Sequence, residues 1–292
     1  MSQQFVSVII PTLNDSARLR QCLSMLENQT YPKHLYEVIV VDNNSKEDIK
    51  GLVDSFNQAR ITHENRKGSY AARNKGISIA KGTILGFTDS DCLPAADWVE
   101  KGVEKLSETY NCGLVAGNVQ IFFKDPKNPT VVEIYDSMNF LRQKHYVENF
   151  KFGATANVFT YKKVFETVGL FNSELKSGGD SEWGKRVFLA GFVQAYADDV
   201  LVMHPARYQW KDIQRKAVRV TEGLYRQGKE RKSLADFTIE ILRDLKSPFK
   251  ELSRTFGSKY PAGLIQKMKL MILVVSLRHL RARTKVKLYL EN

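Results

Sequence analysis

Cysteine and long apolar runs are scarce in this 292-residue sequence. Its three cysteines, Cys22, Cys92 and Cys112, are odd in number and lack metal-ligand spacing, which argues against a disulfide framework and a cysteine-based zinc site. The apolar run Leu270–Leu277 is much shorter than the roughly 20 residues that span a bilayer. No basic leader with an apolar signal core precedes the first expected strand. We therefore expect a cytoplasmic protein.

Positive charge is concentrated in the last third of the chain. From Pro205 to the end there are 21 Lys and Arg residues against 8 Asp and Glu, a balance of +13. The first 204 residues carry 23 against 24, a balance of −1. A boundary near residue 205 therefore separates a nearly neutral part from a basic tail, and the tail indicates an anionic partner.

Short apolar segments alternate with helical patterns along the first 90 residues. We expect strands at residues 5–10, 37–42, 61–64 and 83–88, with a helix in each interval. This order is typical of a parallel sheet wrapped by helices. No G-x-G-x-x-G motif or Walker-type phosphate loop follows the first strand, which argues against dehydrogenases and ATPases.

Two aspartates, Asp89 and Asp91, stand directly after the fourth expected strand. In open α/β sheets the carboxyl edge is where ligands bind, and two unpaired carboxylates so close together repel each other. A divalent cation removes that repulsion, and oxygen ligands suit Mg²⁺ or Mn²⁺. Asp-Ser-Asp is also good turn chemistry, so a surface turn is the alternative interpretation.

Five blocks follow one another along residues 5–205: VSVIIPTLND, EVIVVDNNS, GSYAARNKGI, FTDSDC and GGDSEWGKRV. In this order and spacing the chain resembles the family 2 glycosyltransferases with the GT-A fold. The resemblance implies an α/β catalytic domain over residues 1–205, with a mostly parallel, Rossmann-like nucleotide-sugar-binding half (1–110) and an acceptor-binding half (111–205). A basic helical extension would occupy residues 206–292.

The resemblance also implies how a nucleoside diphosphate sugar would be held. Asp42 would bond the base or ribose, and Asp91 would be the main ligand of Mn²⁺ or Mg²⁺. Asp89 and His204 are the further expected metal ligands, although a lone histidine after apolar residues is often structural. The other residues expected at the donor are Pro11, Thr12, Leu13, Arg73, Asp89 and Ser90.

A second acidic stretch, Gly178–Arg186, matches the position of the catalytic base in the family. The family usually has Glu-Asp there; this chain has Gly179 before Asp180, so only Asp180 carries over as the base. Acidic residues at a helix start are also common for purely structural reasons. The residues expected near the acceptor are Asn157, Glu182 and Trp183.

Together these residues predict transfer with inversion, by one displacement, from a UDP-sugar to a hydroxyl of a glycan or lipid-linked acceptor. An ionised Asp180 would take the hydroxyl proton, and the metal would stabilise the departing diphosphate. Uridine is only the family's commonest base, and neither the sugar nor the oligomeric state can be predicted.

The basic tail allows three interpretations. Its last helix, expected from residue 262 to about 280, places Lys267, Arg278, Arg281 and Lys285 roughly on one face, opposite Ile265, Ile272 and Leu280. Such a helix suits peripheral contact with an anionic membrane surface, or packing on the rest of the protein with a solvated basic face. An anionic glycan or nucleic acid is the third partner, but the tail carries no nucleic-acid-binding motif. A non-catalytic glycan-binding protein is the alternative to an enzyme.

Overall fold

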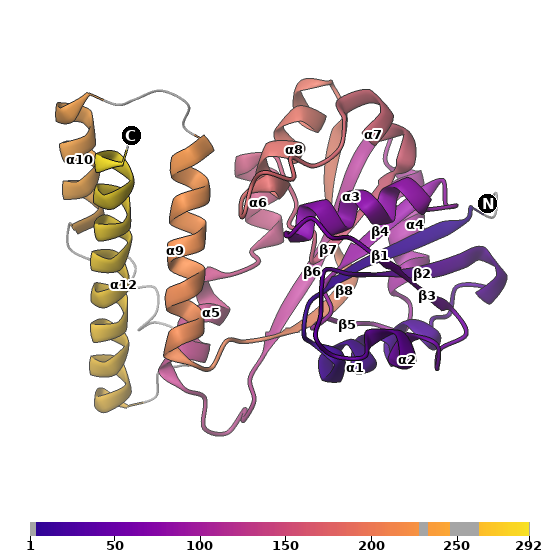
Figure 1. Cartoon of the computed structure of the whole chain (residues 1–292), viewed down its shortest axis with the longest axis horizontal. Coiled ribbons are helices and arrows are strands. Elements are labelled where there is room, and N and C mark those ends of the chain that lie inside the picture. Colours follow the sequence, from indigo (N-terminus) through magenta and orange to yellow (C-terminus); the bar gives the residue numbers. More distant parts are fainter. Residues whose placement is uncertain (1–3, 228–232, 246–262, 292) are drawn as a thin grey trace. The chain divides into compact units, whose positions relative to one another are not determined.

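The computed structural model describes residues 4–227, 233–245 and 263–291. The chain forms two compact units, one of Met1–Gln120 and Leu141–His204, the other of Ile121–Phe140 and Pro205–Asn292. The first unit holds nearly all of the sheet, and the second is helical (Figure 1). The predicted domain boundaries at residues 110 and 205 stay predictions.

One sheet of eight strands forms the centre of the first unit, in the order β3-β2-β1-β4-β7-β6-β8-β5. β1 pairs in parallel with β2 and β4, and β2 with β3, whereas β7 runs antiparallel to β4 and β6. The predicted α/β fold is therefore confirmed. The strands are β1 (Val6–Thr12), β2 (Tyr36–Asp42), β3 (Ala59–His63), β4 (Ile84–Thr88), β5 (Leu93–Pro94), β6 (Cys112–Phe122), β7 (Asn157–Tyr161) and β8 (Val193–Pro205).

The central strands explain where the polar residues gather. Every residue of β2 and β4 is buried, as expected for parallel strands with both faces covered. Thr12 at the end of β1 lies in register with Asp42 at the end of β2. β4 ends at Thr88, immediately before Asp89. Because β1, β2 and β4 are parallel, their carboxyl ends meet at one edge of the sheet.

Helices of the first unit pack on this sheet (Figure 1). Their apolar faces form a core in which Ile9 and Phe87 of the sheet join Phe165 and Trp183 of two helices. Gly76 allows close packing, because a Cβ there would lie 2.5 Å from the Ile9 side chain. The helices are α1 (Ser16–Glu27), α2 (Ile49–Val53), α3 (Ser69–Ile79), α4 (Trp98–Glu108), α6 (Gln143–Phe150), α7 (Lys162–Val168) and α8 (Gly179–Leu189), with a 3₁₀ turn at Lys33–Leu35.

The second unit is built from four described helices: α5 (Val131–Asn139), α9 (Trp210–Gln227), α10 (Leu234–Leu245) and α12 (Leu264–Leu290). Ile134 of α5, Ile213 of α9 and Leu273 of α12 are buried in one apolar cluster. The predicted helical tail is present, and its last helix is longer than expected. Across the described residues, no helix combines the length and hydrophobicity that a membrane span needs.

Residues 131–150 form two helices, α5 and α6, with a break between them. Leu141 in the break has φ of 51°, which lies outside the right-handed helical region and ends the helical path. β8 continues through Asp198 and Asp199 to Pro205.

The basic face predicted for the last helix is largely occupied by contacts within the second unit. Arg278 donates to the Asp244 carbonyl at 3.2 Å, and Arg281 donates to the Tyr135 hydroxyl at 3.0 Å. Lys285 forms ion pairs with Glu240 and Asp244 at 2.8 and 2.6 Å. These contacts favour the packing interpretation for this face.

Gly102→Ala should destabilise the first unit. The added methyl carbon would lie 2.4 Å from the Phe159 ring. Overpacking costs about 1–3 kcal/mol, and the better helix propensity of alanine offsets up to about 1 kcal/mol. We therefore expect a net loss in the free energy of unfolding, measured by urea denaturation. Ser107→Ala, at an exposed site of the same helix, is the matched control; equal stabilities of the two variants would contradict the prediction.

Candidate functional site

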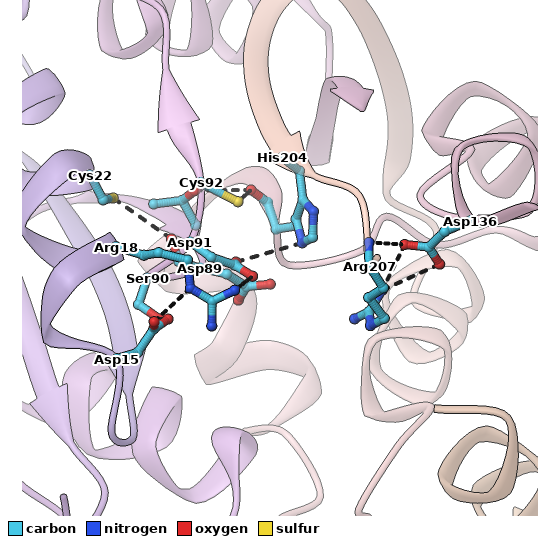
Figure 2. Close-up of polar contacts among 12 residues, drawn as sticks. Asp15, Arg18, Cys22, Asp89, Ser90, Asp91, Cys92, Asp136, His204 and Arg207 are labelled. Carbon is cyan, nitrogen blue, oxygen red and sulfur yellow. Dashed lines mark hydrogen bonds and ion pairs between the residues drawn. The ribbon is translucent and has the colours of Figure 1, made fainter. Parts of the chain in front are cut away.

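A cluster of side chains that could hold a metal ion lies where β4 and β8 end. Ligand atoms of Asp89, Asp91, Cys92 and His204 all lie within 4.8 Å of one another. Figure 2 shows His204 pointing toward Asp91, with 3.6 Å between Nε2 and Oδ1. The structure thus brings together the three predicted metal ligands from sequence positions more than 100 residues apart.

The chemistry of these groups fits a hard divalent cation. Burial raises the pKa of Asp91, and the neighbouring Asp89 raises it further, whereas His204 and Arg18 lower it. Burial also raises the pKa of the Cys92 thiol well above its ordinary value, which keeps it protonated and a poor ligand. Two carboxylates and an imidazole are therefore the usable donors, and the positive charge of Mn²⁺ or Mg²⁺ would relieve the repulsion between the carboxylates.

Two residues that sequence reasoning missed, Asp15 and Arg18, complete this cluster. Arg18 Nη1 lies 3.5 Å from Asp91 Oδ2, and Arg18 Nε donates to Asp15 at 2.6 Å. Asp15 also accepts from the Ser90 hydroxyl at 2.8 Å, so it orients the serine between the two metal-site aspartates. Asp15 stands directly before α1, but its side chain makes no capping hydrogen bond to that helix. The three-residue spacing from Asp15 to Arg18 was the available signal.

Arg73 of α3 lies between the metal-site aspartates and Asp180. Its side chain is 5% exposed, and Nη2 contacts Asp89 Oδ1 at 2.5 Å. Burial raises the pKa of Asp180, and Arg73 is the main influence that lowers it. The Arg73 Nε is buried and makes no hydrogen bond within the described part of the chain. Arg73 therefore stabilises two carboxylates and retains a donor for a further partner.

Asp180 is held at the start of α8 in a half-buried position. Its Oδ1 accepts a hydrogen bond from Thr155 Oγ1 at 3.0 Å, which also lowers its pKa. Because burial has the largest effect, the pKa of the carboxyl still lies above the ordinary value of aspartate. A carboxylate with a raised pKa beside a cation is the arrangement expected of a general base.

Gly179, which stands where the family usually has glutamate, lies against the ring of Tyr70. A Cβ at Gly179 would be 2.7 Å from two ring carbons of Tyr70. The Asp180 amide lies 3.4 Å from the Tyr70 hydroxyl, to which it donates. The tyrosine ring thus occupies the space that a side chain at position 179 would need.

The predicted nucleotide-binding residues lie at the ends of β1 and β2. Asp42 is 7% exposed; it accepts from the Ser45 amide at 3.0 Å and lies 3.3 Å from His63 Nδ1. Thr12 is buried, and its hydroxyl makes no hydrogen bond within the described residues. Pro11 is half-buried, and Leu13 is 54% exposed. Asp42 and Thr12 therefore offer buried polar groups, and Leu13 offers an exposed apolar side chain.

The three residues expected near the acceptor have strong structural roles. Asn157 is fully buried; its amide accepts from Trp98 Nε1 at 2.9 Å and donates to the Val200 carbonyl at 2.8 Å. Trp183 is 1% exposed and stacks on Phe165. Their side chains therefore act in packing. Glu182 is partly exposed and forms an ion pair with Arg186 at 2.8 Å, which fixes its direction.

Two solved structures share the fold of this chain. The first is the mannosyltransferase PcManGT from Pyrobaculum calidifontis, in complex with GDP-Man and Mn²⁺. Its superposition covers 97% of this chain and 86% of that chain, with a TM-score of 0.66 and 20% sequence identity. The second is TarS 1-349 from S. aureus, in complex with UDP. Its superposition covers 96% of this chain and 89% of that chain, with a TM-score of 0.55 and 16% sequence identity. At these identities the likeness shows the fold.

Sequence comparison shows the family. Residues 7–169 match the glycosyl transferase family 2. Glycosyltransferase AglE from Haloferax volcanii is 41% identical over 224 residues, which cover 75% of this chain and 72% of that protein. The predicted family and enzyme class are confirmed: this chain belongs to glycosyl transferase family 2 and is a glycosyltransferase.

Proposed function

We propose that the protein transfers a sugar with inversion, in one displacement, from a UDP-sugar to a hydroxyl of a glycan or lipid-linked acceptor. The observation that carries the proposal is the place of Arg73. It joins Asp89 of the metal-binding cluster through an ion pair and lowers the pKa of Asp180. One buried cation thus connects the group that would hold the donor's metal with the group that would act on the acceptor.

In this proposal Asp91, Asp89 and His204 hold Mn²⁺ or Mg²⁺. When bound, such a cation neutralises charge that develops on a departing diphosphate. Arg18 lies 3.5 Å from the Asp91 carboxylate, so its positive charge would add to that of the cation beside a diphosphate. Arg73 and Ser90 would lie on the donor side of the same cluster.

The nucleoside would lie at the ends of β1 and β2. Asp42 would accept from the base or the ribose, and the unpartnered Thr12 hydroxyl supports a polar ligand there. Pro11 and Leu13 would pack on the base. The solved relatives hold UDP in one case and GDP-Man with Mn²⁺ in the other. UDP is our proposal, and GDP is the alternative that the binding experiment below tests.

Asp180 would be the catalytic base. Thr155 orients its carboxylate, and Tyr70 holds the backbone at the same residue. In the ionised form Asp180 accepts the proton of the attacking hydroxyl. Since metal stabilises the leaving group, one protein carboxylate suffices. Glu182, which is partly exposed, is the residue of the predicted acceptor set with access to solvent. Asn157 and Trp183 would act indirectly, by packing behind the site.

Peripheral contact with a membrane is part of the proposal for a lipid-linked acceptor. The first half of α12 exposes large apolar side chains: Leu264, Ile265 and Ile272 are 74%, 70% and 62% exposed. Lys269 lies within this stretch, so the surface combines apolar and positive character. The contact would use this half of α12 rather than the basic face that binds α10.

Nucleotide binding should depend on both metal and Asp91. Calorimetric titration with UDP, GDP, TDP and CDP, with and without Mn²⁺, should show Mn²⁺-dependent binding of UDP. Asp91→Ala should weaken it at least about tenfold, since a lost metal ligand costs that much or more. Asp97→Ala, which removes an equal charge from an ion pair with Lys101, is the control and should bind normally. Preference for GDP would replace UDP as the donor base, and binding of no nucleotide would refute the donor site.

Asp180→Asn should abolish turnover while leaving the donor bound. Loss of a general base lowers kcat by about 10²–10⁴-fold, and the Kd for UDP with Mn²⁺ should change less than about threefold. Sugar transfer is measured by release of the nucleoside diphosphate. Asp54→Asn, in an exposed ion pair with Lys50, is the matched control and should keep full activity. Turnover near the wild-type rate in Asp180→Asn would exclude this residue as the base.

Thr155→Val should move the acidic limb of the pH profile. The base works in its ionised form, so kcat/KM falls as pH decreases through the pKa of Asp180, which burial places above the ordinary range. Thr155 donates to the carboxylate and lowers that pKa; without the hydroxyl the pKa rises and the limb shifts to higher pH. Valine keeps the size of the buried side chain. An unchanged limb would assign the acidic pKa to another group.

A further inference from the structure

A charged cluster in the second unit joins α5, α9 and the end of β8. Asp136 of α5 is 1% exposed, and its carboxylate accepts from the Arg207 backbone amide at 3.1 Å and from Arg207 Nη1 at 3.2 Å (Figure 2). Lys216 of α9 donates to the other carboxylate oxygen at 2.9 Å. One buried carboxylate therefore holds two cationic side chains.

Positive charge exceeds negative charge in this cluster. Asp136 supplies one negative charge against the two positive charges of Arg207 and Lys216. The centroid of the Phe140 ring lies 4.5 Å from the Arg207 guanidinium carbon and 2.9 Å from Lys216 Nζ. Burial lowers the pKa of Lys216, the Arg207 guanidinium lowers it further, and the Asp136 carboxylate only partly opposes them. These are the signs of a site that lacks negative charge.

The cluster also has donors left for a ligand. Arg207 uses its backbone amide and Nη1 on Asp136, and its Nε and Nη2 make no hydrogen bond to any described residue. The Arg207 side chain is 22% exposed and that of Lys216 is 15% exposed, so both reach solvent from a mostly buried position. An incoming group would meet a guanidinium edge that Asp136 already holds in place.

We propose that Arg207 and Lys216, held by Asp136, form a binding site for a phosphate or diphosphate group. The planar N–H fork of arginine matches phosphate oxygens, and a lysine ammonium adds a second charge. The site goes beyond the proposed transfer reaction, because none of its three residues is among those proposed to hold the metal, the donor or the acceptor. A soluble phosphate and a lipid headgroup both carry the required chemistry.

A purely structural role is the competing explanation. In that case the three residues only fasten α5 to α9, and a buried carboxylate with two partners would be satisfied without a ligand. This role predicts that substitutions change stability. It does not predict saturable binding of phosphate that depends on Arg207 and Lys216.

The test is calorimetric binding of pyrophosphate to the full chain, without divalent metal and at constant ionic strength. Arg207→Gln and Lys216→Met should each weaken binding about tenfold or more, because each removes charge-assisted hydrogen bonds. Arg215→Gln is the matched control: it lies on the same helix and removes the same charge from an exposed pair with Asp212. It should bind within about twofold of wild type. Unfolding by urea confirms that each variant is folded.

Vesicles separate the two sources of phosphate. Co-sedimentation with phosphatidylcholine vesicles containing phosphatidic acid, against phosphatidylcholine alone, is measured for the same variants. Loss of binding in Arg207→Gln and Lys216→Met in either assay supports the site, and loss with vesicles alone identifies a lipid-borne phosphate. Equal binding by all variants in both assays, or no binding by the wild type, would overturn it. The outcome is separate from that of the donor site, since UDP binding with Mn²⁺ is tested through Asp91.

Discussion

Carboxylates at the edge of the sheet need nearby positive charge, and the first unit is arranged to supply it. Asp89, Asp91 and Asp180 converge there, and burial opposes ionisation of the last two. Arg73 forms an ion pair with Asp89, and Arg18 forms one with Asp91. To hold Arg73 in a buried position, α3 packs closely on β1 through Gly76. The close packing of α3 thus keeps the Arg73 guanidinium beside the carboxylates of the site.

The second unit also contains a buried charged cluster, but its balance of positive and negative side chains is different. In the first unit carboxylates outnumber their cations, which favours a metal. Around Asp136 the cations outnumber the carboxylate, which favours an anion. The charge in excess in each buried cluster therefore indicates the opposite charge on its partner: a cation in the first unit and an anion in the second.

The sequence was informative wherever the signal was local. Alternating apolar segments located β1, β2 and β4, and the position of Asp89 and Asp91 after a strand located the cluster that could hold a metal. Contacts between distant residues could not be predicted this way: Arg18 and Asp91 are 73 positions apart, and the sequence at the start of a helix does not indicate such an ion pair. The buried hydrogen bonds of Asn157 join it to Trp98 and Val200, which are 59 and 43 positions away, so its local sequence does not predict them either. The break at Leu141 depends on backbone geometry that apolar spacing does not encode.

The contact between Tyr70 and Gly179 constrains how this protein can diverge. A side chain at position 179 would collide with the ring, so restoring an acidic neighbour to Asp180 requires a smaller residue at position 70 first. A smaller residue at position 70 alone leaves a void beside Asp180 and removes the hydroxyl that its amide binds. Either single change is therefore unfavourable, and we expect the two positions to vary together among descendants of this sequence.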